Sequence, residues 1–226
     1  MNVLLFGATG MVGQGALREC LLATGVRRVV TVGRSATAQQ HPRLRELVAH
    51  DLYDLSSLEA QLTGFDACFF ALGTSAAGKS EASYTRVTHD LTLAVARTLL
   101  RLNPGMTFVY VSGMGTDSSE RGRTMWARVK GRTENALLAL GFKGAYMFRP
   151  GLIVPLHGIK SRTTAYRVLY TIMSPLIPLI RAVFPNGVTT TERVGRAMLA
   201  VAKSGYSTPV LETVDINRVA AQGTIG

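Results

Sequence analysis

A glycine-rich turn close to the N-terminus constrains this chain more than any other feature. Residues 2–6 form a nearly continuous apolar run, which is followed by Gly7-Ala8-Thr9-Gly10-Met11-Val12-Gly13 and then by a helical pattern to Ala23. In such a strand–turn–helix unit the first glycine permits the tight turn, the second lets the backbone approach a pyrophosphate, and the third lets the helix pack on the strand. The helix N-terminus adds free N–H groups for phosphate oxygens. The motif therefore predicts a dinucleotide site at residues 7–13.

The rest of the chain alternates short apolar runs with helical patterns. Strands are expected at residues 2–6, 28–32, 47–49, 67–72, 107–111, 145–148 and 210–214. Helices are expected at residues 11–23, 54–62, 81–101, 126–140 and, from a capping box of Thr189 and Glu192, to about Lys203. This alternation predicts an α/β fold with a doubly wound parallel sheet. A length of 226 residues fits one domain, 1–226, with a small C-terminal helical cap at about 151–190.

The residue after the second strand bears on the choice of nucleotide. An acidic residue about 20 positions past the glycine turn would bind the ribose 2′-hydroxyl of NAD, whereas an arginine there suits the 2′-phosphate of NADP. This chain has Arg34 at that place, in Val32-Gly33-Arg34-Ser35. We therefore expect NADP(H) as the cofactor in preference to NAD(H), with a solvated surface arginine as the alternative interpretation.

At this point the chain resembles the short-chain dehydrogenase/reductase superfamily, and most closely its atypical, NAD(P)H-binding, epimerase-like branch. The resemblance covers nearly the whole chain, because the motifs occur in the family's order and spacing. They are the glycine turn, Gly33-Arg34, His50-Asp51-Leu52, Ala71-Leu72-Gly73-Thr74, Val111-Ser112-Gly113, Val129-Lys130-Gly131 and Phe148-Arg149-Pro150-Gly151. The resemblance implies a Rossmann-like fold with strand order 3-2-1-4-5-6. It also implies Asp51 and Leu52 near adenine, and Leu72, Gly73, Thr74 and Pro150 along the cofactor.

The same resemblance implies a catalytic group with one departure. Reductases of the superfamily use a serine, a tyrosine and a lysine, and Ser112 and Lys130 match the serine and the lysine. The tyrosine position, four residues before the lysine on the same helix face, holds Trp126. An indole N–H can donate a hydrogen bond, but it cannot act as a general acid near neutral pH.

Three interpretations of that departure stay open. Another acid substitutes, with Tyr84, Tyr110, Tyr166 and Tyr170 as candidates; or water supplies the proton; or the protein binds NADPH without turnover, as a sensor or regulator. The expected function is an NADP-dependent oxidoreductase acting on an apolar carbonyl or alcohol. The non-catalytic regulator is its main alternative.

A second phosphate motif competes with the first. Residues 73–80, Gly-Thr-Ser-Ala-Ala-Gly-Lys-Ser, match the P-loop pattern of nucleoside triphosphatases and lie between a strand and a helix. Such an enzyme also needs an aspartate after an apolar strand to hold magnesium. The strand that ends before Ser112 supplies none, so the P-loop is a minor alternative.

Charge and hydropathy address possible partners. The net charge is +11 and 20 of the 25 basic residues are arginine, which favours an anionic partner. Five basic residues lie between Arg121 and Arg132, but aromatic residues other than Trp126 are absent there, so no nucleic-acid binding is expected. The apolar stretch Val168–Ile180 contains Pro175 and Pro178 and suits a cap or a homodimer face, with membrane-surface contact as the alternative. No metal site is expected, because the four histidines lack ligand spacing.

Cysteines and the N-terminus address location. Cys20 and Cys68 both lie in apolar runs, which indicates buried thiols and a reducing compartment. Residues 1–7 lack the basic region and the long apolar core of a signal peptide. The sequence therefore predicts a cytoplasmic protein.

Overall fold

A single parallel sheet organises the protein in the computed structural model, which describes residues 1–159 and 184–222. Seven strands lie in the order β3-β2-β1-β4-β5-β6-β9, and every pair is parallel. The strands are β1 Asn2–Phe6, β2 Arg28–Gly33, β3 Leu44–Val48, β4 Ala67–Phe70, β5 Thr107–Val111, β6 Gly144–Arg149 and β9 Val210–Glu212. The doubly wound α/β fold and the predicted order 3-2-1-4-5-6 are confirmed, and β9 extends the sheet beyond β6.

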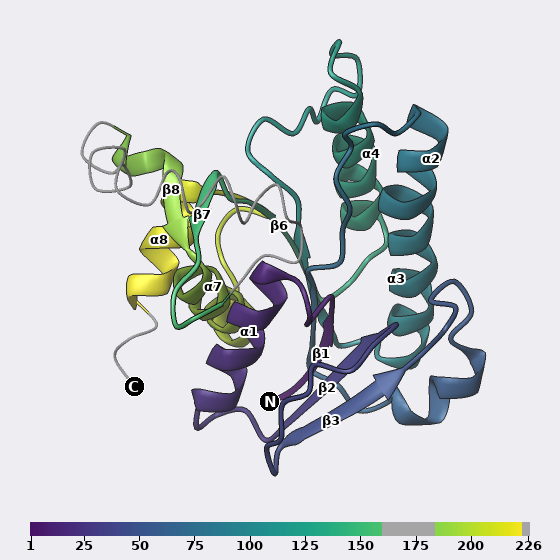
Figure 1. The fold of residues 1–226 in the computed structure, drawn as a ribbon, viewed down its shortest axis with the longest axis vertical. Helices are drawn as coiled ribbons and strands as arrows, with labels where there is room; N and C mark the ends of the chain where they lie inside the picture. Colours follow the sequence, from purple (N-terminus) through teal and green to yellow (C-terminus); the bar gives the residue numbers. More distant parts are fainter. Residues whose placement is uncertain (160–183, 223–226) are drawn as a thin grey trace.

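Helices cover both faces of this sheet (Figure 1). The helices are α1 Met11–Leu22, α2 Glu81–Thr85, α3 Leu91–Leu102, α4 Met125–Ala139, α7 Thr191–Ser204 and α8 Thr213–Gln222. One apolar core, which includes Phe6, Phe70 and Tyr110, packs under α3 and α4. The other, which includes Leu5 and Phe69, packs under α1, α7 and α8. Because side chains alternate along each strand, successive residues of one strand serve opposite cores.

Several element boundaries differ from the predictions for a physical reason. The helix expected at 81–101 is interrupted by a π-helical turn, Arg86–Asp90, which adds a residue without disturbing the apolar pattern on either side. β3 begins at Leu44, before the expected start at residue 47. It lies at the edge of the sheet, where a strand can include polar residues such as Arg45 and Glu46. The expected strand at 210–214 ends at Glu212, and α8 begins at once. The helix at 54–62 is a 3₁₀ turn, Ser56–Gln61.

The predicted capping box at Thr189 is wrong by one residue. Thr190 precedes α7 in extended conformation, and its side chain accepts a hydrogen bond from the Arg193 N–H at 3.1 Å. Thr189 pairs with Ile153, and Thr190 with Val154, in a second, two-stranded parallel sheet, β7 Leu152–Val154 with β8 Val188–Thr190. A helical cap was expected at about residues 151–190. The parts of that segment that the structure describes form the strands β7 and β8, and a 3₁₀ turn, Pro185–Gly187, precedes β8. The segment Val168–Ile180 lies outside the described residues.

Candidate functional site

A pocket of about 490 Å³ opens at the carboxyl ends of β1, β2 and β4. Its volume falls in the range typical of small-molecule sites. Backbone and small side chains dominate its wall, which is formed by Gly7, Ala8, Thr9, Gly10, Met11, Thr31, Val32, Gly33, Arg34, Ser35, Leu52, Ala71, Leu72 and Gly73. In open α/β sheets this edge, where the strand order reverses, is the usual place for a ligand.

The glycines of the turn are required by close backbone contacts. Gly7 has a φ of +80°, and a Cβ atom there would lie 2.6 Å from the Ala71 carbonyl. A Cβ atom on Gly13 would lie 2.1 Å from the Gly7 carbonyl oxygen, so only glycine lets α1 approach β1 this closely. The Gly10 N–H donates to the same Gly7 oxygen at 2.9 Å and closes the turn.

The N-terminus of α1 offers unpaired donors toward this pocket. Gly10 caps the helix without a side-chain hydrogen bond, and its first turn contains no acidic residue. The free N–H groups and the positive end of the helix dipole both favour an anion. A glycine cradle that admits no Cβ, together with an uncapped helix end, fits the pyrophosphate of a dinucleotide.

Arg34 lies on the rim of the same pocket, just after β2. Its side chain is exposed, and no hydrogen bond or ion pair joins it to any residue within 1–159 or 184–222. Its positive charge is therefore not neutralised by a described acid. Neighbouring Thr31, Val32, Gly33 and Ser35 were missed as lining residues, although their place at the carboxyl end of β2 is the signal that could have identified them.

The other predicted cofactor residues lie at varied distances from this wall. Leu52 is buried and lines the pocket, whereas Asp51 is exposed and accepts a hydrogen bond from the Tyr53 N–H at 2.8 Å. Val12 and Gly13 lie in the first turn of α1, behind the wall. Thr74 follows Gly73 and is half-buried.

A second group of predicted residues gathers at the carboxyl end of β5, further along the same edge. Ser112 is buried, and its Oγ lies 2.9 Å from the Thr116 Oγ1. Thr116 donates its own hydroxyl hydrogen to the Gly113 carbonyl at 2.7 Å. The buried Pro150 holds this loop from the other side, because its carbonyl accepts the Met114 N–H at 3.0 Å. Thr116 was not identified from the sequence.

Lys130 faces the same strand from α4. Its ammonium lies 5.5 Å from the centre of the Tyr110 ring, a cation–π geometry. The side chain is half-buried, and burial lowers the pKa of its amine to about 8, against a smaller opposing effect of Glu134. Trp126, one turn earlier, is half-buried, and a Cβ on Gly115 would touch its ring at 3.6 Å. The indole thus packs beside the loop that follows Ser112.

Two of the four candidate tyrosines are described, and both are buried. Tyr110 is 1% exposed, and burial, with smaller effects of Tyr84 and Glu134, raises the pKa of its phenol well above the usual range. Tyr84 lies on α2 and is 2% exposed. Tyr166 and Tyr170 lie outside the described residues.

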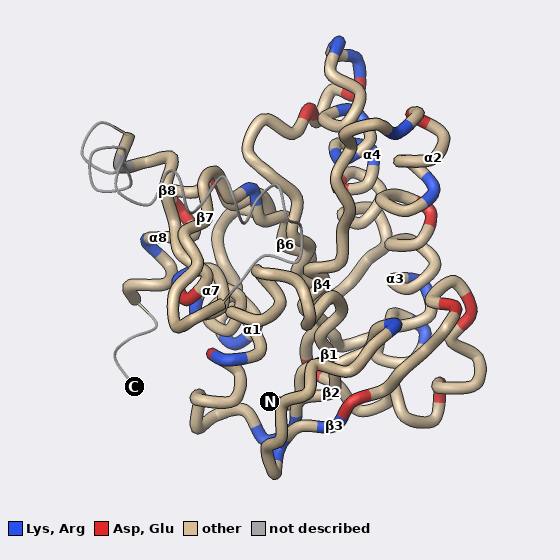
Figure 2. The backbone as a smooth tube through the Cα atoms, viewed as in Figure 1, with Lys and Arg blue, Asp and Glu red and all other residues tan. Residues whose placement is uncertain are grey.

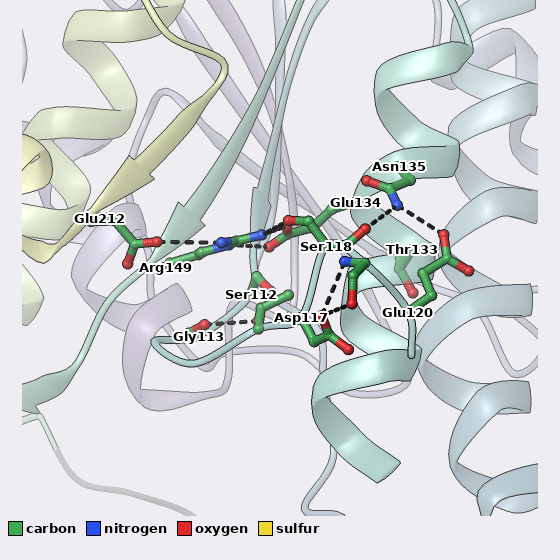
Figure 3. Close-up of polar contacts among 12 residues, drawn as sticks. Ser112, Gly113, Asp117, Ser118, Glu120, Thr133, Glu134, Asn135, Arg149 and Glu212 are labelled. Carbon is green, nitrogen blue, oxygen red and sulfur yellow. Dashed lines mark hydrogen bonds and ion pairs between the residues drawn. The ribbon is translucent and has the colours of Figure 1, made fainter. Parts of the chain in front are cut away.

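A buried ion pair connects α4 to the end of the sheet. Glu134 is 1% exposed, and both of its oxygens lie 3.1 Å from the Arg149 Nε (Figure 3). Arg149 also contacts the Ser118 hydroxyl at 2.5 Å and Glu212 at 3.3 Å. This network was not predicted from the sequence, where its one signal is the arginine inside the Phe148–Gly151 motif.

The P-loop-like segment has a structural role. Gly78 has a φ of +72°, and the Ser80 side chain caps α2 by accepting the Ser83 N–H at 3.3 Å. Gly73 belongs to the wall of the pocket already described. Within residues 1–159 and 184–222, no cluster of three or more His, Cys, Asp or Glu side chains is arranged to hold a metal ion.

Basic residues are spread over several elements (Figure 2). In the run from Arg121 to Arg132, Arg128 pairs with Glu81 at 2.7 Å and Arg132 pairs with Glu120 at 3.4 Å. Of the helices that the structure describes, none has both the length and the apolar character needed to span a bilayer.

Curated relatives are about one-third identical to this chain over the aligned residues. Protein fmp52, mitochondrial, of Emericella nidulans is 34% identical over 159 residues, 67% of this chain and 66% of that protein. Protein FMP52, mitochondrial, of Eremothecium gossypii is 33% identical over 68% of this chain and 67% of that protein. The match thus spans about two thirds of these relatives. Their names say mitochondrial, which contradicts the cytoplasmic location predicted from the cysteines and the N-terminus.

Solved structures share the fold at low sequence identity. An oxidoreductase of the short-chain dehydrogenase/reductase family from Burkholderia thailandensis has a TM-score of 0.68 at 18% identity, covering 98% of this chain and 95% of that one. The enzyme WbmF of Bordetella bronchiseptica, in complex with NAD+, has a TM-score of 0.65 at 18% identity, covering 98% and 77%.

The NAD(P)H-binding family model matches residues 7–139, which contain the glycine turn, Arg34, Ser112 and Lys130. The match covers more than half of the chain and agrees with the resemblance seen in the sequence. This chain therefore belongs to the NAD(P)H-binding family, and it has the fold of the short-chain dehydrogenases/reductases.

Proposed function

We propose that the protein is an NADP(H)-dependent oxidoreductase of an apolar carbonyl or alcohol. The observation that carries the cofactor choice is Arg34, an exposed cation on the pocket rim with no described acidic partner. A charge-assisted contact to a 2′-phosphate fits this position, and no acid stands there to receive a 2′-hydroxyl.

The cofactor would extend from the glycine turn toward Ser112 and Lys130 along the carboxyl edge of the sheet. Residues 7–13 would hold the pyrophosphate, Asp51 and Leu52 would lie at the adenine end, and Leu72, Gly73 and Thr74 would flank the middle. Pro150, Ser112 and Lys130 would lie at the nicotinamide end, where the bound nicotinamide supplies or accepts a hydride. The mainly apolar sequence of Val168–Ile180 supports an apolar substrate.

The substitution Arg34→Glu tests the cofactor choice. We expect the dissociation constant for NADPH to rise about 10- to 100-fold, because a hydrogen bond to a charged group contributes about 1.5–3 kcal/mol. The constant for NADH should change less than threefold. Fluorescence titration of both cofactors measures this. Arg27→Glu is the matched control, because Arg27 is also exposed but precedes β2 at the opposite end of that strand. If Arg34→Glu weakened the binding of NADPH and NADH equally, Arg34 would not be the residue that binds the 2′-phosphate.

A second candidate is a non-catalytic NADPH-binding regulator, favoured by Trp126 at the tyrosine position. The two functions separate in an assay of NADPH oxidation against acetophenone, hexanal and 1-phenyl-1,2-propanedione. Tight NADPH binding without oxidation by any of these carbonyls favours the regulator, whereas turnover of one of them favours the oxidoreductase.

A further inference from the structure

Lys130 carries a half-buried charge without a partner. No hydrogen-bond acceptor or acidic group within 1–159 and 184–222 contacts its ammonium, which instead lies over the Tyr110 ring. The nearest acid along α4, Glu134, is committed to Arg149 through both of its oxygens. An ammonium left free in this way can donate a proton to a ligand.

The position of Lys130 relative to Ser112 follows from the strand. Tyr110 and Ser112 are two residues apart, and Ser112 continues the β5 ladder by donating its N–H to the Phe148 carbonyl at 2.7 Å. Side chains two apart on a strand point to the same face, about 7 Å from one another. The Lys130 ammonium and the Ser112 hydroxyl therefore share the α4 side of the sheet.

The hydrogen bonds of Ser112 leave it an acceptor. A hydroxyl has one hydrogen to donate. Thr116 gives its hydrogen to the Gly113 carbonyl, so the 2.9 Å contact between Ser112 and Thr116 must use the Ser112 hydrogen. Ser112 can then accept from an N–H group, but it has no hydrogen left for a substrate oxygen.

Tyr110 is equally unsuited to donate. Its side chain is 1% exposed, and burial raises the pKa of its phenol well above the usual range. A phenol buried in this way has little access to a substrate. Trp126 cannot supply a proton near neutral pH.

We propose that the Lys130 ammonium is the proton donor to the substrate carbonyl oxygen, in the role that a tyrosine would fill at position 126. This inference rests on the proposed oxidoreductase function. In the reduction, the reduced nicotinamide, when bound, would supply the hydride that the carbonyl carbon gains and would itself be oxidised. The carbonyl oxygen gains the proton as a Lys130 N–H bond breaks and an O–H bond forms. The neutral amine then recovers a proton from water.

The charges around Lys130 suit this role. Burial lowers the pKa of the amine to about 8, so the ammonium dominates at pH 7 yet loses a proton readily. Glu134, on the next turn, opposes that shift, and Arg149 on β6 balances the carboxylate. Tyr110 on β5, Tyr84 on α2 and the Arg128–Glu81 ion pair between α4 and α2 are further titratable groups of these elements. Turnover should therefore fall as pH rises through about 8.

Lysine titration tests the inference without turnover. In the cofactor-loaded protein labelled at the lysine side chains, NMR should show one lysine that titrates near pH 8 and is missing from Lys130→Arg. A Lys130 signal that titrates above pH 10 would overturn the inference.

Turnover of the three carbonyls named above supplies the second test. Lys130→Arg keeps the charge but cannot release a proton, so kcat should fall at least 100-fold while NADPH affinity stays within threefold. The double variant Trp126→Tyr/Lys130→Arg should recover at least 10-fold, because it restores a phenol at the family position. Lys143→Arg, an exposed lysine, is the control and should match the wild type.

The outcomes separate the two proposals. If the wild type reduces a carbonyl and Lys130→Arg retains its kcat, the oxidoreductase stands and Lys130 is not the donor. Loss of turnover in Tyr84→Phe, Tyr166→Phe or Tyr170→Phe, with Lys130→Arg active, would assign the proton to that tyrosine instead. If the wild type oxidises NADPH with none of the carbonyls, the proposed function and this inference both fail.

Discussion

The two ends of the sheet's carboxyl edge differ in what determines their shape. Around β1 and β2, backbone atoms and glycines from one short stretch, residues 7–13, make the contacts. Around β5 and β6, charged and hydroxyl side chains make them, and Glu134, Arg149 and Glu212 come from three separate elements. The first end is thus a rigid backbone cradle, and the second is a network of side chains.

This difference shows that the residue at position 126, where the resemblance implies a tyrosine, does not shape the pocket wall. Position 126 lies on α4, and Trp126 packs beside the loop at Gly115, away from the residues that line the pocket. A change there alters the chemistry available at the second end, whereas the backbone contacts at the first end stay as they are. The two ends can therefore be tested separately.

The largest effect is expected at the backbone cradle, from Gly13→Ala. Helix propensity alone would make this change stabilising by about 1 kcal/mol. The new Cβ would lie 2.1 Å from the Gly7 oxygen, however, so α1 must move away from β1. We expect a loss of at least ~4 kcal/mol in the free energy of unfolding, in the range of exceptional substitutions. NADPH binding should be lost.

Urea unfolding and NADPH titration measure both effects. Gly25→Ala is the matched control, because a Cβ there meets nothing within 4 Å. If Gly13→Ala proved as mild as Gly25→Ala, the cradle would not be rigid, and the contrast between the two ends would disappear.

The same contrast decides how much the sequence could reveal. The glycine turn and the place of Arg34 beside the pocket were predictable, because each depends on neighbouring residues with a fixed spacing, whereas the strand order followed from the resemblance to the family. The Glu134–Arg149 pair was not predictable, since the two residues are 15 apart and their contact depends on how α4 docks beside β6. The shift of the α7 cap from Thr189 to Thr190 has a similar origin, because pairing of β8 with β7 continues through Thr190 and the helix can begin only at Thr191.

Glu134→Ala tests the side-chain network and should have an intermediate effect. Removing one partner of a buried ion pair leaves an uncompensated charge, so the free energy of unfolding should fall by about 3 kcal/mol. NADPH affinity should change less than threefold, because the cradle does not use Glu134. Glu212→Ala removes the half-exposed partner of Arg149 and should cost less than about 1 kcal/mol. Urea unfolding measures both variants. If they lost the same free energy of unfolding, burial would not determine how much each ion pair with Arg149 contributes to stability.

The smallest expected effect is a gain of stability from Lys130→Met. Burial penalises the ammonium in the folded state and lowers its pKa to about 8, while the unfolded chain keeps the ordinary value of 10.5. Below pH 8 both states hold the proton, so the folded protein bears the whole penalty. Between pH 8 and 10.5 the unfolded chain binds more protons, and the stability of the wild type rises with pH.

Lys130→Met should therefore be more stable than the wild type at pH 7, by about 1–2 kcal/mol once the lost contact with Tyr110 is subtracted. The advantage should shrink as pH approaches 10.5, and urea unfolding at pH 7 and pH 9.5 measures it. Lys143→Met, at an exposed position, should change stability by less than about 0.5 kcal/mol at either pH. If Lys130→Met were less stable than the wild type, the Lys130 side chain would contribute to the stability of the side-chain network around β5 and β6. A stabilised one fits a lysine kept at a cost in folding stability, as expected for a group that serves the reaction.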